Sequence, residues 1–116
     1  MSWTSWGTRL AIEGSPSRLV RRAGLFWSRW IELDRVTQVV ANNTDAWTHD
    51  CIWLTLTSDD RRMLQISEFD SNFKRVIEQL ATQFPGIERY AEAVPAVPLE
   101  YTRLVLWVAP GLSQSV

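Results

Sequence analysis

Three consecutive residues, His49, Asp50 and Cys51, are the side chains best suited to chemistry in this sequence. A cysteine nucleophile requires a base that forms its thiolate and donors that hold an oxyanion. In a strand, alternate side chains point to opposite faces, so His49 and Cys51 share a face and Asp50 points away. Because no further base or oxyanion donor accompanies them, we predict that the protein is not an enzyme. A cysteine hydrolase that uses Cys51 and His49 is the alternative.

Metal and cofactor chemistry find even less support in the sequence. One histidine and one cysteine match no known spacing of zinc ligands. The five glycines are isolated from one another and form no phosphate-binding loop. The sequence therefore predicts no metal, no cofactor and no small-molecule substrate.

The charge balance limits the classes of partner. The chain carries 12 basic and 13 acidic residues, which give a net charge of −1. No overall field attracts nucleic acid or an anionic membrane, so we expect neither partner. Up to Arg35, however, six basic residues stand against three acidic ones. Within this stretch Arg18, Arg21 and Arg22 form a weak candidate site for anions, and a solvated strand face is the simpler interpretation.

Seven tryptophans are unusual in a chain of 116 residues. Trp30 and Trp107 lie in apolar runs, which predicts that both pack in the core. Outer tryptophans pack under loops or mark interfaces, so we predict a surface for a protein partner or for self-association. The candidate residues for this surface are Trp47, Asp45, Asp50, Trp27 and Arg29.

Two details of this predicted surface remain open at the level of sequence. Trp47 lies in a polar, turn-rich stretch over 42–50, and either it recognises a partner or it packs back over the domain. Arg29 is expected to stack on a tryptophan ring as a cation–π pair.

Hydrophobic periodicity predicts strands through the first two thirds of the chain. Alternation places Leu54 and Ile66 on the inward faces of a hairpin. The predicted strands cover residues 6–13, 18–22, 26–33, 36–41, 51–57 and 62–67, with a last strand at 102–108. Which face of the 26–33 strand is buried stays undecided.

After Asp70 the apolar spacing becomes that of an amphipathic helix. Asp70 is the expected N-cap, and Pro85 with Gly86 ends the helix. Further helical turns are expected over 87–93. The residues predicted to share the buried stripe of the helix are Phe69, Phe73, Val76, Ile77, Leu80 and Phe84.

The length of the chain predicts a single domain over 1–116, with its core at about 6–108 and a flexible tail at 109–116. A single cysteine excludes an internal disulfide and fits a reducing, cytoplasmic location. The longest apolar run, Leu104–Ala109, is far shorter than the roughly 20 residues that cross a bilayer.

Several segments together resemble a family of small, mostly uncharacterised bacterial proteins with a pleckstrin-homology-like fold. The segments are GLFWSRWIELDRVTQV, DAWTHDCIWLTL, RRMLQIS, FKRVIEQLATQFPGI and PLEYTRLVLW, and they cover about Arg18 to Trp107. The resemblance implies a mainly β fold with one long C-terminal helix (α+β). In it, about seven antiparallel strands form a partly open barrel capped by the helix, with a C-terminal extension.

Folds of this kind are binding scaffolds rather than defined catalysts. The resemblance therefore implies a non-catalytic module that binds a protein or assembles with itself. An immunity protein that neutralises a toxin by direct binding is one alternative. Another is recognition of anionic lipid headgroups, but the arginines near the family's basic motif do not match its spacing closely.

Overall fold

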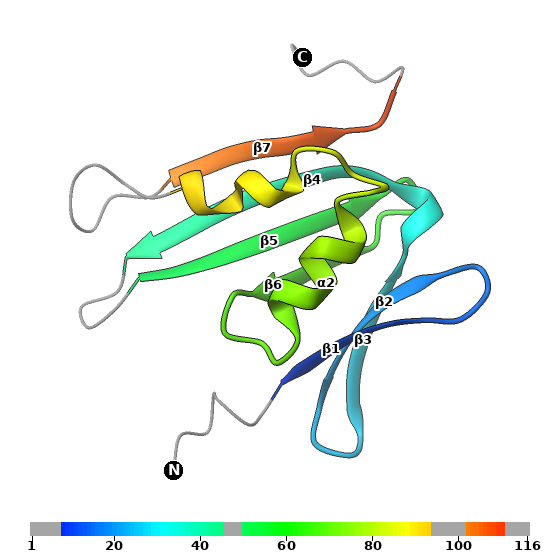
Figure 1. Ribbon diagram of the computed structural model, residues 1–116. Helices are drawn as coiled ribbons and strands as arrows, with labels where there is room; N and C mark the ends of the chain where they lie inside the picture. Colours follow the sequence, from blue (N-terminus) through cyan, green and yellow to red (C-terminus); the bar gives the residue numbers. More distant parts are fainter. Residues whose placement is uncertain (1–7, 46–49, 94–101, 111–116) are drawn as a thin grey trace.

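The computed structural model describes residues 8–45, 50–93 and 102–110, and in these residues the protein is mainly β, with two antiparallel sheets (Figure 1). One sheet has the strand order β1-β2-β3 and the other β6-β5-β4-β7. The strands are β1 (Arg9–Glu13), β2 (Arg18–Ala23), β3 (Trp27–Glu32), β4 (Val36–Asp45), β5 (Asp50–Ser58), β6 (Met63–Ser67) and β7 (Thr102–Val108). The helical segments are η1 (Leu33–Arg35), α2 (Phe73–Leu80) and η2 (Ile87–Glu92).

The three-stranded sheet turns one apolar face toward the core. Leu19 lies opposite Ile31 in the β2–β3 ladder, and both side chains are fully buried. Leu10 on β1 is buried as well and belongs to the same core cluster. This settles the open question of the 26–33 strand, because the face that carries Ile31 is the inward one.

The four-stranded sheet confirms the predicted hairpin and lengthens its strands. Leu54 lies opposite Ile66, and both are fully buried, as alternation predicts. The prediction of a loop over 42–50 was too long, because β4 continues to Asp45 and β5 begins at Asp50. Ladder pairing of Asn43 with Ile52 extends the strands despite the low strand propensity of asparagine.

The long C-terminal helix implied by the resemblance is wrong. Helix α2 has only eight residues, and after turns and the 3₁₀ helix η2 the chain returns as β7 beside β4. The buried stripe is confirmed for Phe73, Val76, Ile77, Leu80 and Phe84. Phe69 departs from it, because this residue precedes the helix and is 53% exposed.

The start of α2 also differs from the prediction. Asn72, with a φ of 70°, is the N-cap, and its side chain makes no capping hydrogen bond. Asp70 does not cap the helix because its carboxylate accepts the backbone N–H of Ser67 and two hydrogen bonds from Arg21.

Of the two tryptophans predicted for the core, Trp107 packs against it and Trp30 does not. Trp107 is partly buried and packs edge-on against Phe84, with ring centroids 4.7 Å apart. Trp30 lies on the face of β3 opposite to Ile31, so its placement in the core was wrong. The guanidinium carbons of Arg18 and Arg62 lie 5.0 and 3.8 Å from the centroid of a Trp30 ring.

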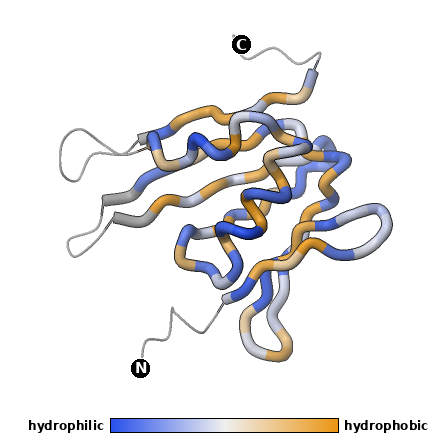
Figure 2. Tube along the Cα trace, in the orientation of Figure 1, coloured by the Kyte–Doolittle hydropathy of each residue, from blue (hydrophilic) through white to orange (hydrophobic). Residues whose placement is uncertain are grey.

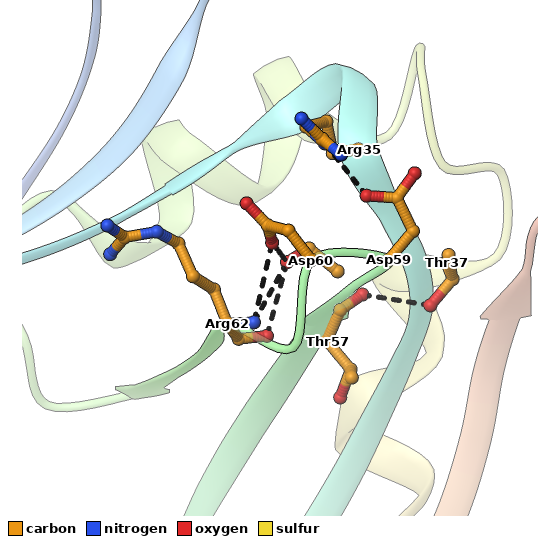
Figure 3. Close-up of polar contacts among 7 residues, drawn as sticks. Arg35, Thr37, Thr57, Asp59, Asp60 and Arg62 are labelled. Carbon is orange, nitrogen blue, oxygen red and sulfur yellow. Dashed lines mark hydrogen bonds and ion pairs between the residues drawn. The ribbon is translucent and has the colours of Figure 1, made fainter.

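Polar contacts fix the corner where η1 joins the two sheets (Figure 3). Arg35 donates to Asp59 through its side chain at 2.8 Å and accepts the Asp59 amide at its backbone carbonyl. The hydroxyl of Ser58 donates to Asp60, and this contact lowers the pKa of Asp60. The β5–β6 turn thus holds Arg62 beside Trp30.

Two positions, Gly86 and Asn43, have unusual surroundings. Gly86 has a φ of 102°, and a Cβ there would lie 2.8 Å from the carbonyl oxygen of Leu106, so glycine is needed where η2 approaches β7. Asn43 is fully buried, and its amide nitrogen and oxygen have no partner in the part of the chain that the structure describes.

Within the residues that the structure describes, no helix has the length and apolar character needed to cross a membrane.

Candidate functional site

A groove of about 230 Å³ lies between the three-stranded sheet and β6. We call it the arginine–tryptophan groove. Its lining consists of Arg21, Trp27, Arg29, Met63, Leu64 and Gln65. It combines exposed apolar surface at Met63 with two guanidinium groups, a composition typical of recognition surfaces rather than of catalytic sites.

The β2–β3 ladder explains why the two arginines reach this groove. Arg21 lies opposite Arg29, and Ala23 lies opposite Trp27. Side chains alternate between the two faces of a strand, so Arg21 and Ala23 share the face of β2 on which Leu19 is buried. Their partners on β3, Arg29 and Trp27, lie on the same face of the sheet. At this end of the sheet the inward face carries charged and aromatic side chains instead of core residues.

Arg21 is held by a buried carboxylate. Its Nε and Nη2 donate to the two carboxylate oxygens of Asp70 at 2.9 and 3.1 Å. The Asp70 side chain is only 1% exposed, and it also accepts hydrogen bonds from the Ser67 amide and the Thr8 hydroxyl. The charge of Arg21 is thus compensated within the protein, which makes it a structural residue.

Two tryptophans flank the same guanidinium group. The guanidinium carbon of Arg21 lies 5.7 Å from the ring centroid of Trp27 and 5.4 Å from that of Trp53. Such contacts attract a cation to the faces of the rings. The arrangement links β2, β3 and β5 at one end of the groove.

Arg29 has the opposite character. Its guanidinium carbon lies 5.4 Å from the ring centroid of Trp27, which is the predicted cation–π contact. No carboxylate forms an ion pair with Arg29 among residues 8–45, 50–93 and 102–110. Within these residues, Arg29 therefore offers a positive charge at the groove with which no carboxylate pairs.

The predicted anion site over Arg18, Arg21 and Arg22 is not one cluster. Arg21 points to the groove, whereas Arg18 and Arg22 lie at alternate positions on the other face of the sheet. Arg22 donates to both carboxylate oxygens of Glu13, which lowers the pKa of Glu13 and raises the pKa of Arg22. Arg18 contacts Trp30.

The remaining predicted site residues lie next to, or within, the segment 46–49 that the structure does not describe. Trp47 and His49 fall outside the described residues. Asp45 and Asp50 are opposite one another at the ends of β4 and β5, and Cys51 is opposite Thr44. The described residues contain no group of three or more His, Cys, Asp or Glu arranged to hold a metal ion.

Sequence reasoning missed the two large apolar residues that are most exposed among the described residues. Leu25 is 89% exposed and Phe26 is 97% exposed, in the turn that joins β2 to β3. The sequence predicts Phe26 as the first residue of a strand with a buried face. The available signal was the placement of two large apolar residues directly after Gly24, where a turn favours polar residues.

Comparisons with known proteins do not identify this chain. No protein-family model matches it. Searches of the curated proteins and of the solved structures find no match either.

Proposed function

We propose that this chain is a non-catalytic binding module that receives a protein partner in the arginine–tryptophan groove. The observation that carries the proposal is the pairing of Arg29 and Trp27 next to exposed Met63. Arginine and tryptophan are enriched among the residues that dominate binding energy at protein interfaces. A cytoplasmic location is part of the proposal and rests on the single cysteine.

The edge of β6 supports an extended segment as the occupant. Ser58 donates its amide to the Arg62 carbonyl, and Glu68 donates its amide to the Ile52 carbonyl. Since hydrogen-bonded pairs alternate in an antiparallel ladder, the backbone groups of Met63 and Gln65 point away from β5, toward the free edge. A partner strand that adds to this edge gains main-chain hydrogen bonds and places side chains in the groove.

The charge of the groove favours an acidic segment. Arg29 carries the charge that is not compensated within the described residues, whereas Arg21 is paired with Asp70. A carboxylate of the partner would form a charge-assisted hydrogen bond with Arg29. A second copy of this chain brings another Arg29 toward the groove, so we favour a different protein.

The proposal extends to the fold family. Two antiparallel sheets with a helix against them support a pleckstrin-homology-like scaffold, in which binding at sheet edges and loops is common. Strand β7, which pairs with β4 after the helix, is an addition to that scaffold.

The test is affinity capture from the native host with matched charge reversals. Arg29→Glu lies in the groove, and Arg75→Glu alters an exposed arginine on α2. We expect a protein that binds the unmodified chain and Arg75→Glu to be lost with Arg29→Glu and with Trp27→Ala. Capture of the same proteins by all four chains contradicts the proposal.

A further inference from the structure

The turn between β2 and β3 forms an apolar tip that projects from the end of the three-stranded sheet (Figure 1). Ala23 and Trp27 are the last paired residues of the hairpin, so the tip consists of Gly24, Leu25 and Phe26. A Cβ at Gly24 would have no atom within 4 Å, and the tip is free of packing on that side. Figure 2 shows the hydrophobic colour at this tip, at the bottom of the view.

The exposure of the tip is extreme for side chains of this type. Leu25 is 89% and Phe26 is 97% exposed, and they are neighbours in the chain. A hairpin turn needs neither residue, because glycine, asparagine or aspartate satisfies its geometry better. The pair therefore has no role in the fold that the structure shows, and an apolar environment outside the protein is the natural place for it.

Two arginines flank the tip, and neither forms an ion pair with a carboxylate among the described residues. Arg9 donates to the carbonyl of Gly24 at 3.4 Å, and Arg29 stacks on Trp27 at the base of the hairpin. Residues 14–31 contain four arginines and no acidic residue. Arg21 and Arg22 are paired with Asp70 and Glu13, so the positive charge near the tip that has no ion pair within the part of the chain that the structure describes comes from Arg9 and Arg29.

We propose that this tip inserts into the surface of an anionic lipid bilayer. Leu25 and Phe26 enter the acyl region, Trp27 lies at the level of the headgroups, and Arg9 with Arg29 contacts lipid phosphates. The net charge of −1 led us to expect no membrane binding. In salt solution, however, screening limits the range of each exposed charge to about 10 Å, so the charges near the tip matter more than the net charge of the chain. The tip is basic on this scale even though the whole chain is not.

A bilayer fits the tip better than the other apolar environments. A second copy of the chain brings Arg9 and Arg29 toward their own counterparts, and these charges repel one another. A protein partner requires a preformed apolar pocket with an acidic rim. A lipid surface adapts to a convex tip of two side chains and supplies the anions around it.

Vesicle cosedimentation tests the proposal. The probes are vesicles of equal parts phosphatidylglycerol and phosphatidylcholine, compared with vesicles of phosphatidylcholine alone. We expect reversible binding to the mixed vesicles that weakens as salt rises, and little binding to the neutral ones. Because each apolar side chain contributes separately to partitioning, Phe26→Ser and Leu25→Ser should each lower the partition coefficient about tenfold.

Matched variants separate insertion from charge alone and from unfolding. Phe69→Ser removes an exposed phenylalanine far from the tip in sequence and should leave binding unchanged. Arg9→Gln with Arg29→Gln should weaken binding and flatten its salt dependence. Lipids with brominated chains should quench tryptophan fluorescence, and Trp27→Phe should remove most of this quenching.

Three results would overturn the proposal: no binding to the mixed vesicles at low salt, equal binding by Phe26→Ser and the unmodified chain, or equal binding to neutral vesicles. Capture of an acidic protein that requires Phe26, without vesicle binding, would assign the tip to a protein partner instead. Met63→Ser alters the lining of the groove without touching the tip, and Phe26→Ser alters the tip without changing a residue that lines the groove. The failure of this inference and that of the proposed function are therefore distinguishable.

Discussion

The two ends of β3 show how one strand serves a core and a surface. At one end Ile31 is fully buried opposite Leu19, and just before the other end Phe26 is 97% exposed. The backbone ladder is continuous from Trp27 to Glu32. The difference comes from the second layer, which covers the sheet at Ile31 and does not reach the tip. Apolar character alone therefore does not decide which residues form the core.

Arg21 and Arg29 repeat this contrast between charged residues. They are directly opposite in the β2–β3 ladder, and both contact Trp27. The Arg21 guanidinium forms an ion pair with the buried carboxylate of Asp70. Arg29 stacks on the Trp27 ring and forms no ion pair within the described residues. Two identical side chains in adjacent strands are thus expected to act differently, one on stability and the other on binding.

Aspartate substitutions at Ile31, within β3, and at Phe26, directly before β3, should give the largest difference in stability. A carboxylate at Ile31 is buried without a partner, which costs several kcal/mol and approaches the whole stability of a small domain. Ile31→Asp should therefore be largely unfolded. Phe26→Asp should change the free energy of unfolding by less than about 0.5 kcal/mol. Thermal unfolding followed by circular dichroism measures both, and similar losses would show that the tip belongs to the core.

Removing the partner of Arg21 should cost less than the core substitution but far more than a groove substitution. Asp70→Ala leaves Arg21 and the Ser67 amide without their acceptor and should lower the free energy of unfolding by about 3 kcal/mol. Arg29→Ala should change it by less than about 0.5 kcal/mol. Urea titration gives both values. An equal effect of the two variants would refute the division into structural and binding arginines.

The free energy of unfolding should increase when the buried polar side chain of Asn43 is replaced by an apolar one. Asn43 is fully buried, and neither polar atom of its side chain has a partner in the described residues. Asn43→Leu replaces it with an apolar side chain of similar size, and we expect a gain of about 1 kcal/mol. A lower melting temperature for this variant would indicate that the amide has a partner in the folded protein.

The smallest expected effect comes from the exposed pair of Glu13 and Arg22. The hydrogen bond from Arg22 lowers the pKa of Glu13 below its usual value of 4.5. The stabilisation from a lowered carboxyl pKa is present above the unfolded pKa and is lost as the pH falls through the folded pKa. The melting temperature should therefore drop slightly more on acidification in the unmodified protein than in Glu13→Gln. Identical pH profiles would show that the pair contributes nothing measurable.

Sequence patterns located most elements of the fold because local alternation reports burial. The pairing of Leu54 with Ile66 and the buried face of α2 followed from spacing alone. The extension of β4 and β5 did not, since asparagine and aspartate have low strand propensity and the ladder determines their conformation. The position of β7 beside β4 depends on contacts between distant segments, which periodicity does not report.

The candidate site was predictable to a smaller extent. A cation–π contact of Arg29 with a tryptophan ring was predicted, and the structure shows that Trp27, on the same face of β3, supplies the ring. The pairing of Arg21 with Asp70 was not, because the two lie 49 residues apart and Asp70 also satisfies a helix N-cap pattern. The exposure of Phe26 depends on where the second sheet ends, and that is a property of the assembled layers.

The position of β7 in its sheet has a consequence for the time course of folding. Strands β4, β5 and β6 are consecutive and can pair soon after they are synthesised, whereas β4 gains its other neighbour only after α2, η2 and β7 exist. Contacts between distant segments form slowly, and an unpaired strand edge is a template for other chains. We expect the nascent or refolding chain to aggregate most readily in this interval, through the edge of β4 that β7 later covers.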